Sequence, residues 1–467
     1  MGIIKSVKLG FDSVMFQLLF LALYLPTTTL AVKPKEYGKA IFLTPFIERN
    51  KIDIALNQSR VLPLKGSDVV SHAGFLTVNK AYNSCLFMWF FESETTPEYA
   101  PVVLWLQGGP GSSALQTIFQ ENGRYYLKPS KGVGLRKHYL SQSMNTIYID
   151  SPVGTGFSFT DRAEGYSRDE NQAAADLYKA LVQIFQLFEK YRRNEFFIVG
   201  QEYGGKLAIS LAELITEKNQ NNVKKINLKG LAIGNGLFDP ISMVDSYANL
   251  LYTIGLIDLE WKKQFETKQA ELKRLIGQNQ FSNAVDTYID MLIGNENSMF
   301  KNVTGYKNSL NYLQDTENSL YGTLEYNLKE KPFLRNATHV GYVPFNDGVV
   351  ARDYLKDSIM QSVKPNLEKL LPKYRVLVYS GQLNIMVPYV AISKFLNSLK
   401  WSGSWSFKLA PRKLWIVDGA IAGYCKHTKT LSEVMIKDAG QLVSFDQPKL
   451  TKEMIVKFTT NTFTECS

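Results

Sequence analysis

The chain has 467 residues, of which 45% are hydrophobic and 21% charged, so it is long and apolar enough to fold around a large buried core. This composition excludes an intrinsically disordered protein, and we find no internal repeat at solenoid or propeller spacing. The net charge of +10 comes from basic residues spread along the chain, which favours a generally basic solvated surface over a nucleic-acid site.

The N-terminal segment has the pattern of a secretory signal peptide. Lys5 and Lys8 precede an apolar run over residues 14–25, and a small-residue end follows at Ala31. A membrane anchor is the alternative, but the run is shorter than the roughly 20 residues that span a bilayer. We therefore predict a signal peptide over residues 1–31 and a mature protein that is secreted or lysosomal, without a membrane span.

Beyond the signal peptide, short apolar runs alternate with amphipathic stretches of helical period. This alternation predicts an α/β fold with a mostly parallel sheet and helices on both of its faces. The continuous apolar character of the runs is typical of central parallel strands. The expected strands cover residues 86–91, 102–106, 146–149, 196–199, 228–233, 376–379 and 413–417, and the clearest helices cover 171–191 and 205–215.

Between about residues 258 and 336 the apolar strands disappear. Residues 259–276 and 281–293 have helical spacing and many Lys, Glu and Gln side chains. We predict a helical cap insertion over the active end of the sheet. The mature chain, residues 32–467, is then a single domain that contains this insertion.

Two further features fit the secretory route. Asn57, Asn302 and Asn336 each begin an acceptor triplet for N-glycosylation. The three cysteines, Cys85, Cys425 and Cys466, permit one disulfide, and the sequence does not decide which pair forms or whether one forms.

The most informative segment is the apolar run of residues 196–199 followed by Gly200-Gln201-Glu202-Tyr203-Gly204. A strand, a tight turn between glycines and a helix form the nucleophile elbow of α/β hydrolases, in which Gly-x-Ser-x-Gly places a serine on a strained turn. Glu202 stands here at the position of the serine. By itself, a Gly-x-x-x-Gly pattern after a strand is weak evidence.

Two longer motifs make the assignment specific. Residues 104–113 read LWLQGGPGSS and residues 147–158 read IYIDSPVGTGFS. With the elbow, they resemble the landmarks of the serine carboxypeptidases, and the chain is most similar to the vitellogenic carboxypeptidase-like branch. The resemblance covers about residues 73–458 and implies the α/β-hydrolase fold.

The chain departs from this family at all three positions of the catalytic triad. By resemblance, Glu202 replaces the serine, Asn384 after Gly381-Gln382-Leu383 replaces the aspartate, and Gln441 after Ala439-Gly440 replaces the histidine. Acyl transfer needs a hydroxyl nucleophile, an imidazole that carries its proton and a carboxylate that orients the imidazole. None of the three residues can perform the original task. We instead expect a polar chain in which Gln441 donates to Glu202 and accepts from Asn384.

Other parts of the site are retained in altered form. The resemblance makes Gly109 and Tyr203 the oxyanion donors, and Gln107, Gly108 and Gln201 the subsite for the C-terminal carboxylate of a peptide. Gln201 is neutral and can donate a hydrogen bond directly, whereas an ionised Glu202 repels a carboxylate. We expect the repulsion to win.

These features predict a secreted, catalytically inactive carboxypeptidase homologue that binds a peptide or protein in the ancestral cleft. One alternative is a residual or altered hydrolase that releases C-terminal residues, with Glu202 as the nucleophile. The other is a bulk secreted protein that retains the fold for solubility. No metal or cofactor pattern is present. Dimers are common in the family that the chain resembles, so the resemblance allows a homodimer, but no residue pattern fixes the oligomeric state.

Overall fold

The structure is a computed structural model that describes residues 37–62, 64, 69–128, 132–294, 297–314 and 331–463. The predicted signal peptide and Cys466 lie outside these residues. The chain from Tyr37 onward belongs to one compact unit. Within the described residues, no helix is both long and apolar enough to cross a bilayer.

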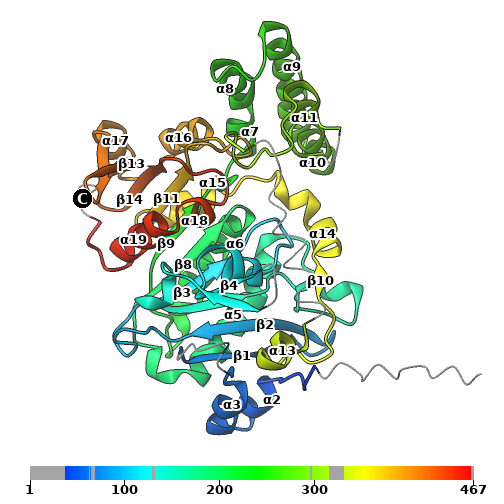
Figure 1. Cartoon of the computed structure of the whole chain (residues 1–467), viewed down its shortest axis with the longest axis vertical. Coiled ribbons are helices and arrows are strands. Elements are labelled where there is room, and N and C mark those ends of the chain that lie inside the picture. Colours follow the sequence, from blue (N-terminus) through cyan, green and yellow to red (C-terminus); the bar gives the residue numbers. More distant parts are fainter. Residues whose placement is uncertain are drawn as a thin grey trace, which may run out of the picture. The chain divides into compact units, whose positions relative to one another are not determined.

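A ten-stranded sheet forms the centre of this unit (Figure 1). The six central strands, from β6 to β14 in the spatial order given below, run parallel to one another. Two further strands at each edge of the sheet, β1 and β2 on one side and β13 and β12 on the other, are joined antiparallel. All seven strands expected from the sequence are present, which confirms the mostly parallel sheet. In spatial order the strands are β1 Ser71–Asn79, β2 Ser84–Phe91, β6 Asn145–Ile149, β3 Val102–Leu106, β8 Phe196–Gln201, β9 Leu228–Gly234, β11 Arg375–Gly381, β14 Leu431–Ile436, β13 Ala420–His427 and β12 Lys413–Val417.

The central strands are buried on both faces, because successive side chains point to opposite sides of the sheet. In β3, Leu104 belongs to one apolar cluster and its neighbours Val103 and Trp105 belong to another. Helices α5 (Glu170–Leu187) and α6 (Tyr203–Asn221) pack into the first cluster, and α19 (Pro448–Thr459) packs into the second. The sheet is therefore covered on both faces, as predicted.

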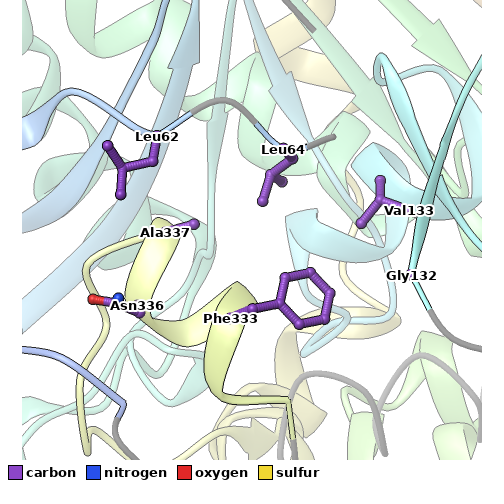
Figure 2. A pocket seen from close by; sticks show the side chains of 7 residues that line it. All are labelled: Leu62, Leu64, Gly132, Val133, Phe333, Asn336 and Ala337. Atoms are coloured by element: carbon purple, nitrogen blue, oxygen red, sulfur yellow. The ribbon is translucent and has the colours of Figure 1, made fainter. Parts of the chain in front are cut away.

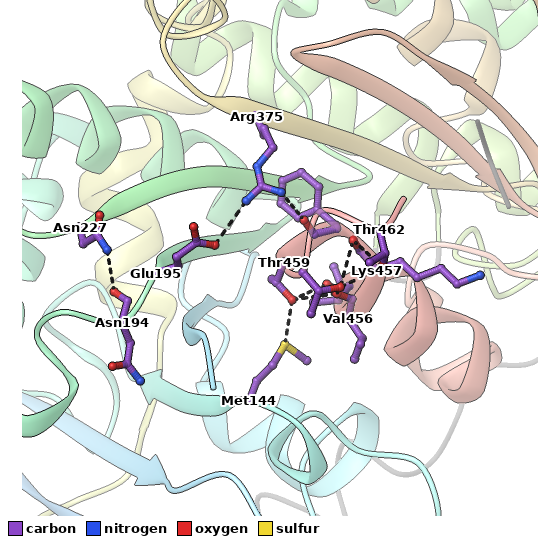
Figure 3. Close-up of polar contacts among 12 residues, drawn as sticks. Met144, Asn194, Glu195, Asn227, Arg375, Val456, Lys457, Thr459 and Thr462 are labelled. Atoms are coloured by element: carbon purple, nitrogen blue, oxygen red, sulfur yellow. Dashed lines mark hydrogen bonds and ion pairs between the residues drawn. The ribbon is translucent and has the colours of Figure 1, made fainter. Parts of the chain in front are cut away.

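The C-terminal helix is tied to the end of the sheet at which the parallel strands begin (Figure 3). Arg375, the first residue of β11, lies 3.6 Å from the carboxylate of Glu195 and donates a 3.1 Å hydrogen bond to the carbonyl of Phe458 in α19. Thr459 also contacts the sulfur of Met144 at 3.6 Å. This last contact joins residues that are 315 positions apart in sequence.

The described chain between β9 and β11 is mainly helical and adds no strand to the ten-stranded sheet; its one short strand, β10 (Asn346–Asp347), pairs instead with β7 (Thr155–Gly156). The first of its helices begins at Pro240, well before the predicted start near residue 258, and the last ends at Leu370. Part of this region has its own apolar cluster, which includes Phe265, Leu272 and Phe300. In Figure 1, helices α8 to α11 lie together at the top of the view. The helices are α7 Pro240–Met243, α8 Tyr247–Thr253, α9 Leu259–Gly277, α10 Phe281–Tyr288, α11 Met299–Thr304, α13 Pro332–Ala337, α14 Val349–Ile359 and α15 Lys364–Leu370.

Candidate active site

Glu202 lies on the turn between β8 and α6, with a φ of 53° and a ψ of −121°. A positive φ is uncommon for a residue with a side chain, so this turn has the strained backbone of an elbow. The flanking glycines are required by close packing. A Cβ on Gly200 would lie 2.3 Å from the carbonyl oxygen of Gly204, and a Cβ on Gly204 would lie 2.3 Å from that of Leu106.

The carboxylate of Glu202 points back toward the loop after β3. The amide of Gly109 donates a 3.2 Å hydrogen bond to Oε2 of Glu202, and the side chain of Gln441 is also a hydrogen-bond partner of this carboxylate. Burial raises the pKa of Glu202, while the bonds from Gln441 and Gly109 lower it. One of the expected oxyanion donors, Gly109, is therefore already bound by a side chain of the same protein.

Asn384 and Gln441 lie next to each other, and each is 1% exposed. The amide nitrogen of Asn384 donates to Oε1 of Gln441 and, at 2.9 Å, to the carbonyl of Val387. Together with the contact between Gln441 and Glu202, this hydrogen bond agrees with the polar chain expected from the sequence. The amide and carboxylate groups of these three side chains hydrogen-bond to one another. Glu202 is the one of the three that can accept a proton near neutral pH.

Asn235, directly after β9, holds the two loops that carry Asn384 and Gln441. Its side-chain nitrogen donates to the carbonyl of Gln441 at 2.6 Å, and its oxygen accepts from the amide of Gly381 at 3.1 Å. Asn235 is fully buried and has a φ of 49°. No local sequence pattern points to this role, because the contacts join residues about 150 and 200 positions apart.

A second buried acid, Glu121, lies beside the expected carboxylate subsite. Its two oxygens accept hydrogen bonds from Nε2 of Gln107 at 2.9 Å and from the hydroxyl of Ser444 at 2.6 Å. Burial raises the pKa of Glu121 to about 6, against the effect of these bonds and of nearby Gln201. Sequence reasoning missed Glu121. Its one signal in the sequence is that it is an acid at the end of the uncharged run of residues 114–120.

The two glycine-containing motifs are joined by Asp150. Its carboxylate accepts from the hydroxyl of Ser113 at 2.6 Å and from the amides of Ala114 and Phe157, both at 2.8 Å. This buried acid fixes the loop that carries Gly109 against the segment after β6. The long motifs seen in the sequence are thus two halves of one support for the site.

The remaining predicted positions are placed as follows. Gly108 is buried against Glu202, since a Cβ on it would lie 2.4 Å from Cβ of Glu202. The side chain of Tyr203 is turned away from the turn, and its hydroxyl lies 2.7 Å from Ser358. The helical region also reaches the loop of Asn384, because the hydroxyl of Tyr288 in α10 donates a 2.7 Å hydrogen bond to the carbonyl of Met386.

No histidine takes the place of the missing imidazole, although all four lie among the described residues. His72 bonds to Ser59 and His427 to Ser432, while His339 contacts the carbonyl of Arg60. His138 lies among lysines. The described residues also contain no group of three or more His, Cys, Asp or Glu side chains that would hold a metal ion.

The three predicted glycosylation positions, Asn57, Asn302 and Asn336, are all exposed. Asn336 borders an apolar pocket of about 470 Å³ that contains none of the other predicted site residues (Figure 2). The pocket is lined by Leu62, Leu64, Gly132, Val133, Phe333, Asn336 and Ala337.

Of the three cysteines, Cys425 is disulfide-bonded and Cys85 is a buried free thiol. The third cysteine, Cys466, lies outside the described residues.

An elbow after β8 at the carboxyl end of a mostly parallel sheet defines the class of the α/β hydrolases. Residues 63–461 match the model of the serine carboxypeptidase family, and the chain belongs to this family. It is 41% identical to the human probable serine carboxypeptidase CPVL, over 94% of this chain and 93% of the relative. It is 40% identical to a venom serine carboxypeptidase of Apis mellifera, covering 91% and 92%, and 39% identical to the vitellogenic carboxypeptidase of Aedes aegypti, covering 91% of each.

Among solved structures, the chain resembles Kex1(delta)p, a prohormone-processing carboxypeptidase from Saccharomyces cerevisiae. The TM-score is 0.74 at 19% identity, covering 87% of this chain and 96% of the other. At this identity the likeness shows the fold alone.

Proposed function

We propose that this serine carboxypeptidase homologue is secreted, has lost catalysis and binds peptides at the ancestral site. The observation that carries the proposal is the position of Glu202 on the elbow, with its carboxylate on the amide of Gly109. We take Glu202, Asn384 and Gln441 as the equivalents of the triad. A secretory route is supported by the N-terminal pattern and by the name of the venom relative.

Two physical arguments support inactivity. First, a substrate carbonyl that needs the amide of Gly109 must compete with a carboxylate tethered 3.2 Å away. Second, Gln441 cannot accept a proton from a nucleophile or activate water. Removing single members of a triad already costs orders of magnitude in rate, and losses within such a unit are not additive.

The proposal is tested by hydrolysis of N-blocked dipeptides by the purified protein across acidic to neutral pH. The matched sample is the revertant Glu202→Ser/Asn384→Asp/Gln441→His. We expect a silent parent and an active revertant, because the revertant restores the nucleophile and base and frees Gly109. Turnover by the parent that survives repurification would contradict the proposal.

The names of the relatives favour a second candidate, a hydrolase with Glu202 as nucleophile. Attack by the carboxylate of Glu202 on the last peptide carbonyl would break the C–N bond, release the C-terminal amino acid and leave a mixed anhydride, whose hydrolysis needs a base that the site does not offer. Under this candidate the parent turns over and Glu202→Gln abolishes turnover. If the parent and the revertant are both silent, the peptide-binding groups have also decayed, and the alternative of a bulk secreted protein gains support.

A further inference from the structure

We propose that the outer edge of the sheet carries a peripheral membrane-binding surface, which inserts Trp405 and Leu409 into bilayers with an anionic surface. None of its residues belongs to the candidate active site, so this inference does not depend on the proposed function. The surface, which we call the edge patch, consists of the exposed apolar side chains of Trp405, Leu409, Leu414, Ile416 and Ile421.

Strand β12 is the last strand of the sheet and turns apolar side chains to solvent. Leu414 and Ile416 are 54% and 43% exposed, whereas Trp415 and Val417, which alternate with them, are buried in the core. Ile421 in β13 is 47% exposed and pairs directly with Ile416, so both side chains lie on the same face. Edge strands ordinarily carry polar or charged residues on a solvated face, and this one does not.

Helix α17 (Ser404–Leu409) covers part of the same face of the sheet. Tyr424 in β13 pairs with Leu414, and Lys426 lies two positions further along β13, so these three side chains are on one face. Nζ of Lys426 donates a 3.3 Å hydrogen bond to the carbonyl of Lys408 in α17. The helix and the strand also lie beside each other in Figure 1. The apolar residues of α17, β12 and β13 therefore share one surface.

The helix turns two large apolar side chains outward. Trp405 and Leu409 are four residues apart and therefore lie on one side of α17. They are 71% and 66% exposed, whereas Phe407, on the opposite side, is buried. Trp405 is the one exposed tryptophan among the six of the chain, all of which lie in the described residues. Tryptophan is enriched at membrane–water interfaces, because its ring is apolar and its N–H group is polar.

The segment that carries the edge patch is strongly basic. Residues 400–433 contain six Lys or Arg residues and only two acids. Both acids lie close to cations, because Asp418 forms an ion pair with Lys449 and Glu433 is buried near Lys426. The surface therefore presents positive charge beside its apolar side chains. The six basic residues are Lys400, Lys408, Arg412, Lys413, Lys426 and Lys429.

The charge and the apolar side chains together favour an anionic bilayer over other partners. A second copy of the chain would bring the same positive charge to the interface, and the like charges would repel each other. A soluble polyanion would pair with the cations but would leave Trp405 and Leu409 in water. A bilayer with anionic headgroups attracts the cations and buries the apolar side chains at the boundary between headgroups and acyl chains. Exposed apolar patches with a polar rim are typical of such interaction sites.

The first test is co-sedimentation of the purified protein with vesicles at about 0.1 M salt. One set of vesicles contains phosphatidylserine and phosphatidylcholine, and the other contains phosphatidylcholine alone. We expect binding to the anionic vesicles to be at least about 10-fold stronger, because each cation near the surface adds attraction. Equal binding to both sets, or no binding to the anionic set, would overturn the proposal.

The second test separates insertion from the general attraction of a basic protein. Trp405→Ser/Leu409→Ser removes the two outward side chains without changing the charge, and we expect binding to anionic vesicles to fall at least about 10-fold. The matched control is Tyr99→Ser/Val223→Ser, at two positions that are at least as exposed. It should bind as the parent does. Unchanged binding by the first variant, or equal losses in both, would contradict insertion at the edge patch.

The third test addresses the charge. Lys408→Gln removes a cation next to Leu409, and we expect binding to anionic vesicles to fall about 5-fold. Lys263→Gln lowers the charge of the whole chain equally, at an exposed position in α9, and should have little effect. Similar losses in the two variants would show that binding follows the net charge and not this surface.

Insertion can also be read directly from tryptophan fluorescence, with vesicles whose acyl chains carry bromine as the quencher. We expect quenching in the parent and its loss in Trp405→Phe, which should keep most of the binding because phenylalanine still inserts. Quenching that persists in this variant would place another tryptophan in the bilayer and overturn the proposal. Binding to heparin but not to vesicles would assign the cations to a soluble polyanion, and self-association that is lost in Trp405→Ser/Leu409→Ser, without vesicle binding, would assign the edge patch to a second copy. Either result would also overturn it.

Discussion

At the scale of single residues, the site is unusual in placing acids where water reaches them poorly. Glu121 is 1% exposed and its pKa is raised to about 6, chiefly by burial. The groups that face it are the carboxylate of Glu202, the guanidinium of Arg136 and the phenols of Tyr148 and Tyr379. The folded state therefore holds the proton of Glu121 more tightly than the unfolded chain does.

This gives a prediction with a definite sign. Because the folded pKa lies above the ordinary value, ionised Glu121 lowers the free energy of unfolding by about 2 kcal/mol above pH 6, and the loss disappears as pH falls toward about 4.5. Glu121→Gln should thus be more stable than the parent at neutral pH and nearly equal to it at the acidic end. Urea unfolding at both ends of the window measures this.

The control for this experiment is Glu260→Gln, an exposed residue in the first turn of α9. The difference in the free energy of unfolding between Glu260→Gln and the parent should not show the change that Glu121→Gln shows over this pH window. A stability difference for Glu121→Gln that stays constant over the window would show that Glu121 titrates as an ordinary carboxyl.

At the scale of elements, α6 does more than follow the elbow, because it also holds the end of α14. The ammonium of Lys206 is 2% exposed and donates to the carbonyls of Ser358, Ile359 and Gln361 at 2.8, 2.7 and 2.6 Å. It also lies 3.6 Å from the carboxylate of Glu170, the first residue of α5. One cation thus satisfies the last carbonyls of a helix and joins three helices beneath the elbow.

We therefore expect Lys206→Met to lower the free energy of unfolding by about 3–5 kcal/mol, because it leaves Glu170 and several carbonyls buried without a partner. Chemical unfolding of the purified variant measures the loss. Lys179→Met in α5 removes an exposed lysine paired with Asp176 and should cost less than about 1 kcal/mol. Similar losses in the two variants would refute a structural role for the buried cation.

At the scale of the whole molecule, distant parts of the chain meet at the carboxyl ends of the central strands. The segment of residues 309–312, which follows α11, bonds to both site loops. The amide of Gln441 donates to the carbonyl of Leu310 at 2.7 Å, and the amide of Ile385 donates to that of Ser309 at 3.2 Å. The helical region is therefore part of the site and not only a cover, and its folding supports the positions of Asn384 and Gln441.

The secretory route is also a property of the whole chain and can be tested directly. When the full chain is expressed in a secreting cell, we expect the mature protein in the medium to begin at Val32, after removal of residues 1–31. Enzymatic removal of N-glycans should convert modified asparagines among Asn57, Asn302 and Asn336 to aspartate, which peptide mass mapping detects. A secreted protein that begins at Met1, or one unmodified at all three positions, would contradict this prediction.

The sequence by itself determined the parallel sheet and the elbow. Buried parallel strands are continuous apolar runs, and the turn after β8 needs glycines that are visible as letters. The sequence did not show where the helical region begins, because α7 and α8 are short and their helical period is weak over so few residues.

Only the tertiary structure decided how the polar groups of the site are arranged. Glu121 and Ser444 are 323 residues apart, and Asn235 and Gln441 are 206 apart, so no local pattern predicts that they bond. The same holds for the occupation of the Gly109 amide by Glu202. Local periodicity follows from backbone geometry, whereas these contacts depend on which strands become neighbours when the chain packs.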